Sequence, residues 1–256
     1  MPQNNILEEI WNEGQHILPK STRHLYEPSS SFCLQERDMR DLLLKNGLEK
    51  EWLAWKLVVR PAIHSNRSAK YISKEYALQK SKEYSRRARD WKELINSLLF
   101  NEKAQTGSVL IDVGSHEGDE MAGLDFKITC IDPSEEICIA GKSKHPNMKF
   151  RRGTADNTLE ASNYYDIYIS LRTWCVAGVL SDEAFIEAKR ILKPNGLLMV
   201  SFPLRYKNGV RSWENVQEDN ITQVARWTMG LLKDNLSYVK TYAGPEDFFI
   251  YGRIKP

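Results

Sequence analysis

The stretch Ser108-Val-Leu-Ile-Asp112-Val-Gly114-Ser-His116-Glu-Gly118-Asp is the part of this chain that decides its fold. Its apolar and β-branched residues predict a buried strand over Val109–Val113, and its glycines predict a loop directly after that strand. We expect a helix over Glu117–Leu124. Glycine lets the backbone approach a ligand closely, and the first amides of a helix can bind a carboxylate. The stretch therefore predicts a ligand-binding loop at the end of a strand.

A second acid, Asp132, lies twenty residues after Asp112 and ends the strand predicted at Ile128–Ile131. A carboxylate in this position can accept hydrogen bonds from both hydroxyls of a ribose, as it does in dinucleotide sites. A nicotinamide dehydrogenase is nevertheless disfavoured. Its loop has the pattern Gly-x-Gly-x-x-Gly without an acid two residues before the first glycine, and this chain meets neither condition.

Residues 101–256 alternate short apolar runs with amphipathic stretches, a pattern typical of βα units and a mostly parallel sheet. Strands are expected at Val109–Val113, Ile128–Ile131, Met148–Arg151, Asp166–Ser170, Leu197–Phe202, Tyr238–Tyr242 and Phe248–Arg253. Further helices are expected at Ser134–Ser143, Ser181–Leu192 and Trp213–Leu232, with a turn at Pro194-Asn195-Gly196. Only about five residues around Gly244-Pro245 join the last two strands, so these strands should pair antiparallel.

The predicted fold is thus α/β, with a seven-stranded, mostly parallel sheet, an antiparallel final strand, helices on both faces and an N-terminal helical region. Helical periodicity over Met39–Val59 and Ser68–Phe100 supports the last feature, while Pro19–Phe32 is expected to be a loop. We place a helical accessory region at residues 1–90 and a Rossmann-like domain at 91–256.

Composition restricts the functional classes. The 256 residues carry a net charge of +2, too small to indicate a polyanionic partner for the whole molecule. No apolar run is long enough for a membrane span, and Glu8, Glu9 and Glu13 interrupt a signal peptide, so a cytoplasmic location is expected. The four cysteines form no C-x-x-C pair, which disfavours a zinc site and predicts reduced, mostly buried thiols. The oligomeric state is not indicated.

The loop and the two acids resemble those of class I S-adenosylmethionine-dependent methyltransferases, over roughly Trp91–Pro256. The resemblance implies S-adenosylmethionine as the cofactor. Asp112 would hold its methionine ammonium, and Asp132 its ribose. The remaining residues that it implies at the cofactor are Gly114, Ser115, Gly118, Pro133, Ala155, Asp156, Ser170 and Leu171. Among these, Asp156 would lie beside the adenine amino group, or it could instead cap a short helix that follows it.

One residue departs from the family pattern, because His116 occupies the position of the middle glycine. Its side chain must point away from the cofactor or form a wall of the cofactor pocket. A catalytic role for His116 is a further alternative.

The loop after the fourth predicted strand contains Arg172 and Trp174, and it lies at the sheet edge where α/β proteins bind ligands. Arg172 could orient an anionic acceptor, and Trp174 could face the sulfonium or stack on the acceptor. The alternative is that Arg172 forms an ion pair and Trp174 belongs to the core.

Three functions remain open for this chain. Methyl transfer to an oxygen or nitrogen of a small molecule is favoured, because helices before the core often form a lid in this family. RNA methylation is supported by the basic segment Arg60–Arg89, since nine basic against three acidic residues between Val59 and Trp91 leave a local excess of +6. A non-catalytic protein that keeps the fold is the third alternative, given His116.

Overall fold

The computed structural model describes residues 37, 40–41, 43–54, 90–175, 179–244 and 247–256. The predicted loop at Pro19–Phe32 and the basic segment Arg60–Arg89 lie outside the described residues. Of the two predicted N-terminal helical stretches, the described parts include helix α3, at Glu49–Ala54, and a helix over residues 90–101.

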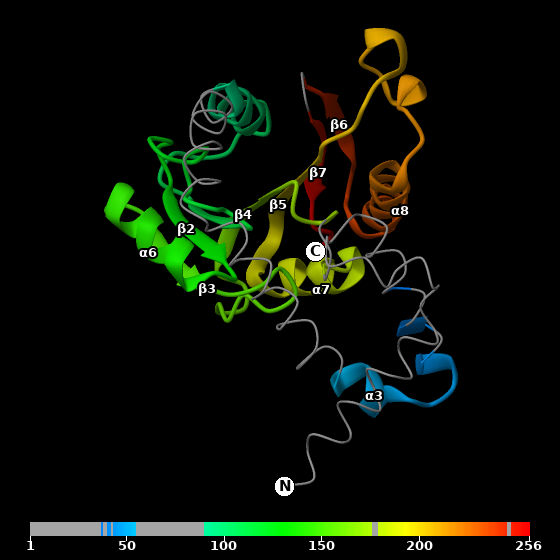
Figure 1. The fold of residues 1–256 in the computed structure, drawn as a ribbon. Helices are drawn as coiled ribbons and strands as arrows, with labels where there is room; N and C mark the ends of the chain where they lie inside the picture. Colours follow the sequence, from blue (N-terminus) through cyan, green and yellow to red (C-terminus); the bar gives the residue numbers. More distant parts are fainter. Residues whose placement is uncertain (1–36, 38–39, 42, 55–89, 176–178, 245–246) are drawn as a thin grey trace, which may run out of the picture.

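A seven-stranded sheet forms the centre of the molecule (Figure 1). Its strands are β1 Val109–Val113, β2 Lys127–Asp132, β3 Lys149–Arg152, β4 Tyr165–Leu171, β5 Leu192–Phe202, β6 Lys240–Ala243 and β7 Phe248–Arg253. The order across the sheet is β3-β2-β1-β4-β5-β7-β6, and β7 alone runs antiparallel to the other six strands. The predicted seven strands and the antiparallel final strand are confirmed.

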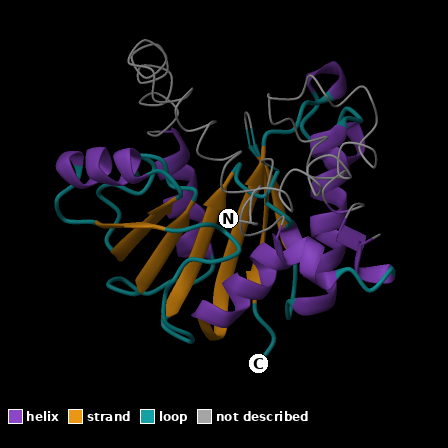
Figure 2. Cartoon of the chain, turned by 60° about the horizontal axis from the view of Figure 1, so that its bottom comes forward, coloured by secondary structure: helices purple, strands orange, loops and turns teal. Residues whose placement is uncertain are grey.

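Helices cover both faces of this sheet (Figure 2). The labelled helices of the domain are α6 Glu135–Lys144, α7 Ser181–Ile191 and α8 Asn220–Asn235, and two 3-10 turns lie at Lys207–Gly209 and Trp213–Asn215. Ser134 caps α6 by accepting a hydrogen bond from the Ile137 amide, and Asp219 caps α8 in the same way through Thr222. Within the described part of the chain, no helix has the length and apolar character needed to cross a bilayer.

The two faces of the sheet carry separate apolar layers, as the alternation of side chains along a strand requires. Ile111 and Val113 of β1 face α7 and α8, where Phe185 and Leu232 complete the layer. Leu110 faces the other way, toward the helix of residues 90–101. That helix buries Trp91, Ile95, Leu98 and Leu99 against the sheet, so it is packed into the core.

Two helix predictions are wrong. Residues 117–124 form turns, because Gly118 and Gly123 both have positive φ and the Ala122 amide makes the one i to i−4 backbone bond recorded there. The helix predicted from Trp213 begins at Asn220, after the Asp219 cap. The turn predicted at Pro194-Asn195-Gly196 lies within β5, where Asn195 has a φ of 62° and the pairing with β4 shifts register.

Candidate cofactor and methyl-transfer site

The residues singled out in the sequence gather at the carboxyl edge of the sheet. The chain passes from β1 to β2 on one side and later returns to β4 on the other, so the strand order changes direction between β1 and β4. Open α/β sheets bind ligands in the crevice at such a switch point. The loops that follow β1, β2, β3 and β4 meet there.

Asp112 lies near the end of β1 with only 2% of its surface exposed. Its carboxylate receives no hydrogen bond from the residues that the structure describes. Burial raises the pKa of Asp112 well above its ordinary value, and the nearby charges of Glu120 and Asp132 raise it further. A buried carboxylate without a partner is costly, so this position fits a cationic group such as the methionine ammonium.

Asp132 ends β2 and is also buried, but its carboxylate is engaged. Oδ1 accepts the Ser134 amide at 2.9 Å, and Oδ2 accepts the His116 amide at 3.2 Å. Burial raises the pKa of Asp132, and these two amides oppose that shift. Each carboxylate oxygen can accept more than one hydrogen bond, so the group can still accept bonds from ribose hydroxyls.

The glycine loop follows a path that few side chains allow. Gly114, His116 and Gly118 all have positive φ, with values of 77°, 50° and 77°. A Cβ on Gly114 would lie 2.0 Å from Thr173 Oγ1, so a glycine there lets this loop pack against the loop after β4. The Gly114 and Ser115 amides donate to the Ile131 carbonyl, so these two N–H groups are already used within the loop.

His116 adopts the left-handed conformation that the family's glycine would favour, and its side chain is exposed. The bond from its amide to the Asp132 carboxylate links this conformation to the end of β2. Whether the exposed His116 side chain points away from the cofactor or forms a wall of its pocket stays a prediction.

Glu120 is a third acid of the site, which sequence reasoning missed. Burial raises its pKa to about 7, and Asp119 adds to the shift. The turn that carries it is fastened to α6, because Asp119 accepts bonds from Lys144 Nζ at 2.6 Å and pairs with His145 Nε2 at 2.7 Å. The only sequence signal was its place two residues after Gly118.

The residues expected around the adenosine lie on neighbouring loops. Ala155 is buried and Asp156 half-buried in a turn, closed by a 3.0 Å bond from the Thr154 amide to the Asn157 carbonyl. In this described stretch no helix lies between Asp156 and β4. The alternative that Asp156 caps a short helix is therefore wrong. Pro133 and Leu171 are half-buried, while Ser170 is fully buried and donates its hydroxyl to the Val113 carbonyl at 2.8 Å.

Arg172 forms an ion pair, one of the two alternatives that the sequence left open. Its Nε and Nη2 donate to the two carboxylate oxygens of Asp247 at 2.7 and 2.9 Å, and its guanidinium lies 4.7 Å from the Trp91 ring. Asp247 has no exposed side-chain surface. Asp247 therefore balances the charge of Arg172. The expected contact between Arg172 and an anionic acceptor stays a prediction.

Trp174 lies in the core, again the second alternative. It is 0% exposed, and its indole donates to the Tyr168 hydroxyl at 3.3 Å. The structure therefore gives no support to contact between Trp174 and the sulfonium or the acceptor.

Tyr206 is a further polar group near this edge that the sequence did not reveal. It follows β5, and its hydroxyl is buried without a hydrogen-bond partner among the described residues. Burial raises the pKa of Tyr206, and the negative charge of Asp247 raises it further. Arg172, Asp247 and Tyr206 thus come from three separate segments of the chain, and the charge of Asp247 acts on both of the others.

Comparison with known proteins agrees with this geometry. Residues 111–200 match the family model of a methyltransferase domain. A Methanococcus maripaludis protein, assigned as an S-adenosylmethionine-dependent methyltransferase, has 20% identity and a TM-score of 0.53, covering 71% of this chain and 93% of its own. At this identity, the similarity shows that the two chains share a fold. No curated protein matches the chain.

Two further solved structures are similar at lower scores. A methyltransferase of Thermotoga maritima has 18% identity and a TM-score of 0.49, covering 71% of this chain and 98% of its own. Geranyl diphosphate C-methyltransferase of Streptomyces coelicolor, solved with S-adenosylhomocysteine, has 12% identity and a TM-score of 0.48, with 64% and 79% covered.

The matched residues run from Ile111 to Val200 and therefore include Asp112, the glycine loop and Asp132. The strand order, the unpartnered carboxylate and the family match point to the same assignment. Residues 111–200 thus match a methyltransferase domain, in a sheet with the class I, Rossmann-like strand order, and S-adenosylmethionine is the cofactor of this domain.

Proposed function

We propose that this domain transfers the methyl group of S-adenosylmethionine to an oxygen or nitrogen nucleophile of a small molecule. The observation that supports donor binding is Asp112, a carboxylate that is 98% buried and has no hydrogen bond within the described chain. A cationic methionine end would supply the missing partner. This also argues against the non-catalytic alternative, because a protein that never bound the donor would gain stability by losing this charge.

The charges around the site favour a neutral or cationic acceptor. Asp112, Glu120 and Asp132 surround the loop after β1, and Asp247 cancels Arg172. A polyanion such as RNA would be repelled by this described part of the site. The basic segment that supports the RNA alternative lies outside the described residues, so the proposal here rests on the site itself.

Bound S-adenosylmethionine supplies a methyl group on a sulfonium, which is a good leaving group. The chain then needs to position the acceptor in line with the methyl carbon and to exclude water, and positioning can contribute up to roughly 7 to 11 kcal/mol. Asp112 would hold the ammonium, and Asp132 the ribose. Arg172 and Asp247 would fix the loop after β4 on the acceptor side by their two-point ion pair.

We further propose that residues 1–90 act as an accessory lid on a domain of residues 91–256. Arg40 supports contact between the two parts, because its guanidinium bonds to Asp182 in the first turn of α7. A cytoplasmic location, expected from the sequence, stays a prediction.

Calorimetry with S-adenosylmethionine and S-adenosylhomocysteine tests the proposal. Wild type should bind in the micromolar range, and Asp132→Ala should weaken binding by roughly 1 to 3 kcal/mol, because polar ligand groups lose their partner. Asp234→Ala, an exposed acid of α8, is the matched control and should bind normally. Equal affinity in wild type and Asp132→Ala would remove Asp132 from the site.

Transfer itself is tested by following S-adenosylhomocysteine formation with primary amines, phenols, carboxylic acids and RNA as acceptors. Turnover with amines or phenols supports the proposal. Turnover with RNA alone contradicts the small-molecule assignment, and no turnover despite donor binding contradicts catalysis.

A further inference from the structure

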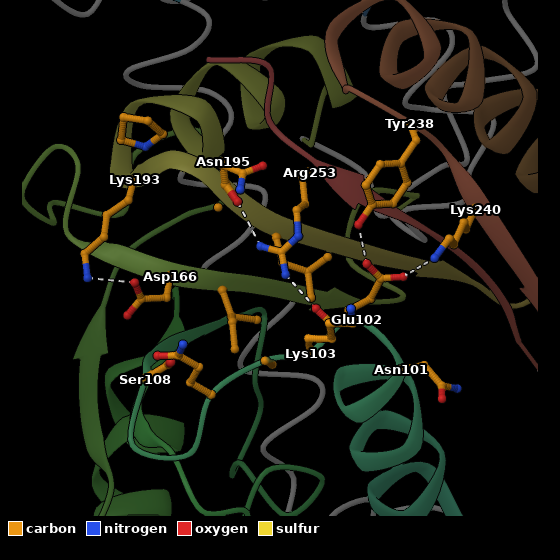
Figure 3. A pocket seen from close by; sticks show the side chains of 16 residues that line it. Asn101, Glu102, Lys103, Ser108, Asp166, Lys193, Asn195, Tyr238, Lys240 and Arg253 are labelled. Atoms are coloured by element: carbon orange, nitrogen blue, oxygen red, sulfur yellow. Dashed lines mark hydrogen bonds and ion pairs between the residues drawn. The ribbon is translucent and has the colours of Figure 1, made fainter.

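A cavity lies at the amino edge of the sheet, opposite the edge that carries the candidate methyl-transfer site (Figure 3). Its volume is about 640 Å³, within the range of small-molecule sites. Its walls come from the end of the helix of residues 90–101, the start of β1, β4 and β5, strand β6 and the end of β7. It is therefore separated from the methyl-transfer site by the length of the central strands.

The two carboxylates of this cavity already have partners. Glu102 is buried and accepts bonds from the Tyr238 hydroxyl and from Lys240 Nζ, the latter at 2.7 Å. Asp166 accepts Lys193 Nζ at 2.7 Å and the Val109 amide at 2.9 Å. Burial opposes ionisation of both groups, yet these donors lower the pKa of each, so both are charged at neutral pH. Each carboxylate is matched by one lysine.

Two cations of the cavity, Arg253 and Lys103, form no direct ion pair with a carboxylate of the described residues, although the charge of Arg253 also acts on Glu102. Arg253 donates to the main-chain carbonyls of Asn195 at 2.9 Å and Glu102 at 2.6 Å, which carry no formal charge. Lys103 lines the same cavity, and no ion pair to it is recorded among the described residues. The carboxyl end of the neighbouring helix contributes at most about half a negative charge. The cavity therefore keeps a positive excess.

The fixed guanidinium distinguishes this cavity from an exposed basic surface. Two main-chain carbonyls hold Arg253 in place, and a guanidinium has five N–H groups, so donors remain for a ligand. Lys103, Ser108 and Asn101 also line this cavity and are labelled in Figure 3. An arginine fork with a lysine and a hydroxyl is the donor set that suits the several oxygens of a phosphate.

We propose that this amino-edge cavity binds a small, phosphate-bearing ligand, with Arg253 and Lys103 as its charged contacts. The volume exceeds that of a phosphate alone, so a phosphate ester of sugar or nucleotide size fits the class. The inference does not depend on the proposed function, because none of these residues contacts the methyl-transfer site.

Calorimetry with inorganic pyrophosphate on the full chain, at constant ionic strength, tests this proposal. Wild type should show saturable binding, and Arg253→Gln and Lys103→Gln should each weaken it at least about tenfold, since each removes a charge-assisted bond. Lys149→Gln removes an equal charge from an exposed position on β3 and should leave binding unchanged.

S-adenosylmethionine affinity, measured on the same variants, should stay at the wild-type value, which separates this proposal from the methyl-transfer assignment. Lys103→Gln decides the test even where Arg253→Gln fails to fold, because Lys103 is exposed. Absence of pyrophosphate binding, an equal loss in Lys149→Gln, or equally tight binding of citrate would each overturn the phosphate assignment.

Discussion

The two edges of the central sheet bury carboxylates in opposite ways. At the amino edge, Glu102 and Asp166 each have a lysine and a further donor. At the carboxyl edge, Asp112 has no hydrogen bond from the described chain, and the charges of Glu120 and Asp132 act on it. A hydrogen-bonded carboxylate stabilises the fold, whereas an ionised carboxylate without a partner costs free energy until it is protonated or a ligand supplies a cation. We therefore interpret the carboxylates of the amino edge as structural and Asp112 as a ligand-binding carboxylate.

Replacement of Asp112 should give the largest effect. Asp112→Asn removes the buried charge, so we expect S-adenosylmethionine to bind roughly 30-fold more weakly, a loss of about 2 kcal/mol. The free protein should become more stable by about 1 kcal/mol, because the desolvated charge is gone. Calorimetry and thermal unfolding measure the two effects. A variant that loses stability as well as affinity would show that Asp112 has a structural partner.

The matching change at the other edge should have the opposite sign. Glu102→Gln leaves Lys240 and Tyr238 without their buried carboxylate, so the free energy of unfolding should fall by about 2 kcal/mol. Denaturant titration measures this loss. Glu93→Gln, on an exposed position of the same helix, is the control and should change stability by less than about 0.5 kcal/mol. Unchanged stability in Glu102→Gln would remove the contrast between the edges.

A change of pH around 7 should alter stability and donor binding at the carboxyl edge, where Glu120 lies. The pKa of Glu120 is raised from 4.5 to about 7, so its contribution to stability is present below pH 4.5 and is lost as pH rises through 7. Donor binding has the opposite dependence, because the cationic donor prefers the ionised carboxylate. S-adenosylmethionine affinity should rise roughly tenfold between pH 6 and pH 8, and Glu120→Gln should flatten this rise. A flat wild-type profile would contradict this role for Glu120.

The contrast between the edges also shows what the sequence could predict. Local patterns predicted β1 and β7 with the bounds that the structure shows, because each is a short apolar run with clear ends. The helix at Glu117–Leu124 failed because glycines with positive φ replace helical bonds by turns. The sequence pattern favoured a helix there, but the positive φ angles of the two glycines are incompatible with helical backbone.

Local sequence patterns could not predict which residues far apart in the chain form ion pairs. Asp247 lies 75 residues from Arg172, and Lys240 lies 138 residues from Glu102. Only the order of strands brings such groups together, so the sequence showed Asp112 and Asp132 but left open whether Arg172 was paired. The same reason hid Glu120 and Tyr206, whose meaning depends on burial.

Tyr206 provides the smallest test of the comparison. Its buried hydroxyl lacks a partner in the described structure, so Tyr206→Phe should cost no stability and should raise the free energy of unfolding by about 1 kcal/mol. Tyr238→Phe is the matched change at the amino edge, where the hydroxyl donates to buried Glu102, and it should lower stability by about 1 kcal/mol. Denaturant unfolding of both variants measures the pair. Opposite signs would extend the difference between the edges from carboxylates to hydroxyls, whereas a loss of stability in both variants would mean that the Tyr206 hydroxyl is hydrogen-bonded within the protein.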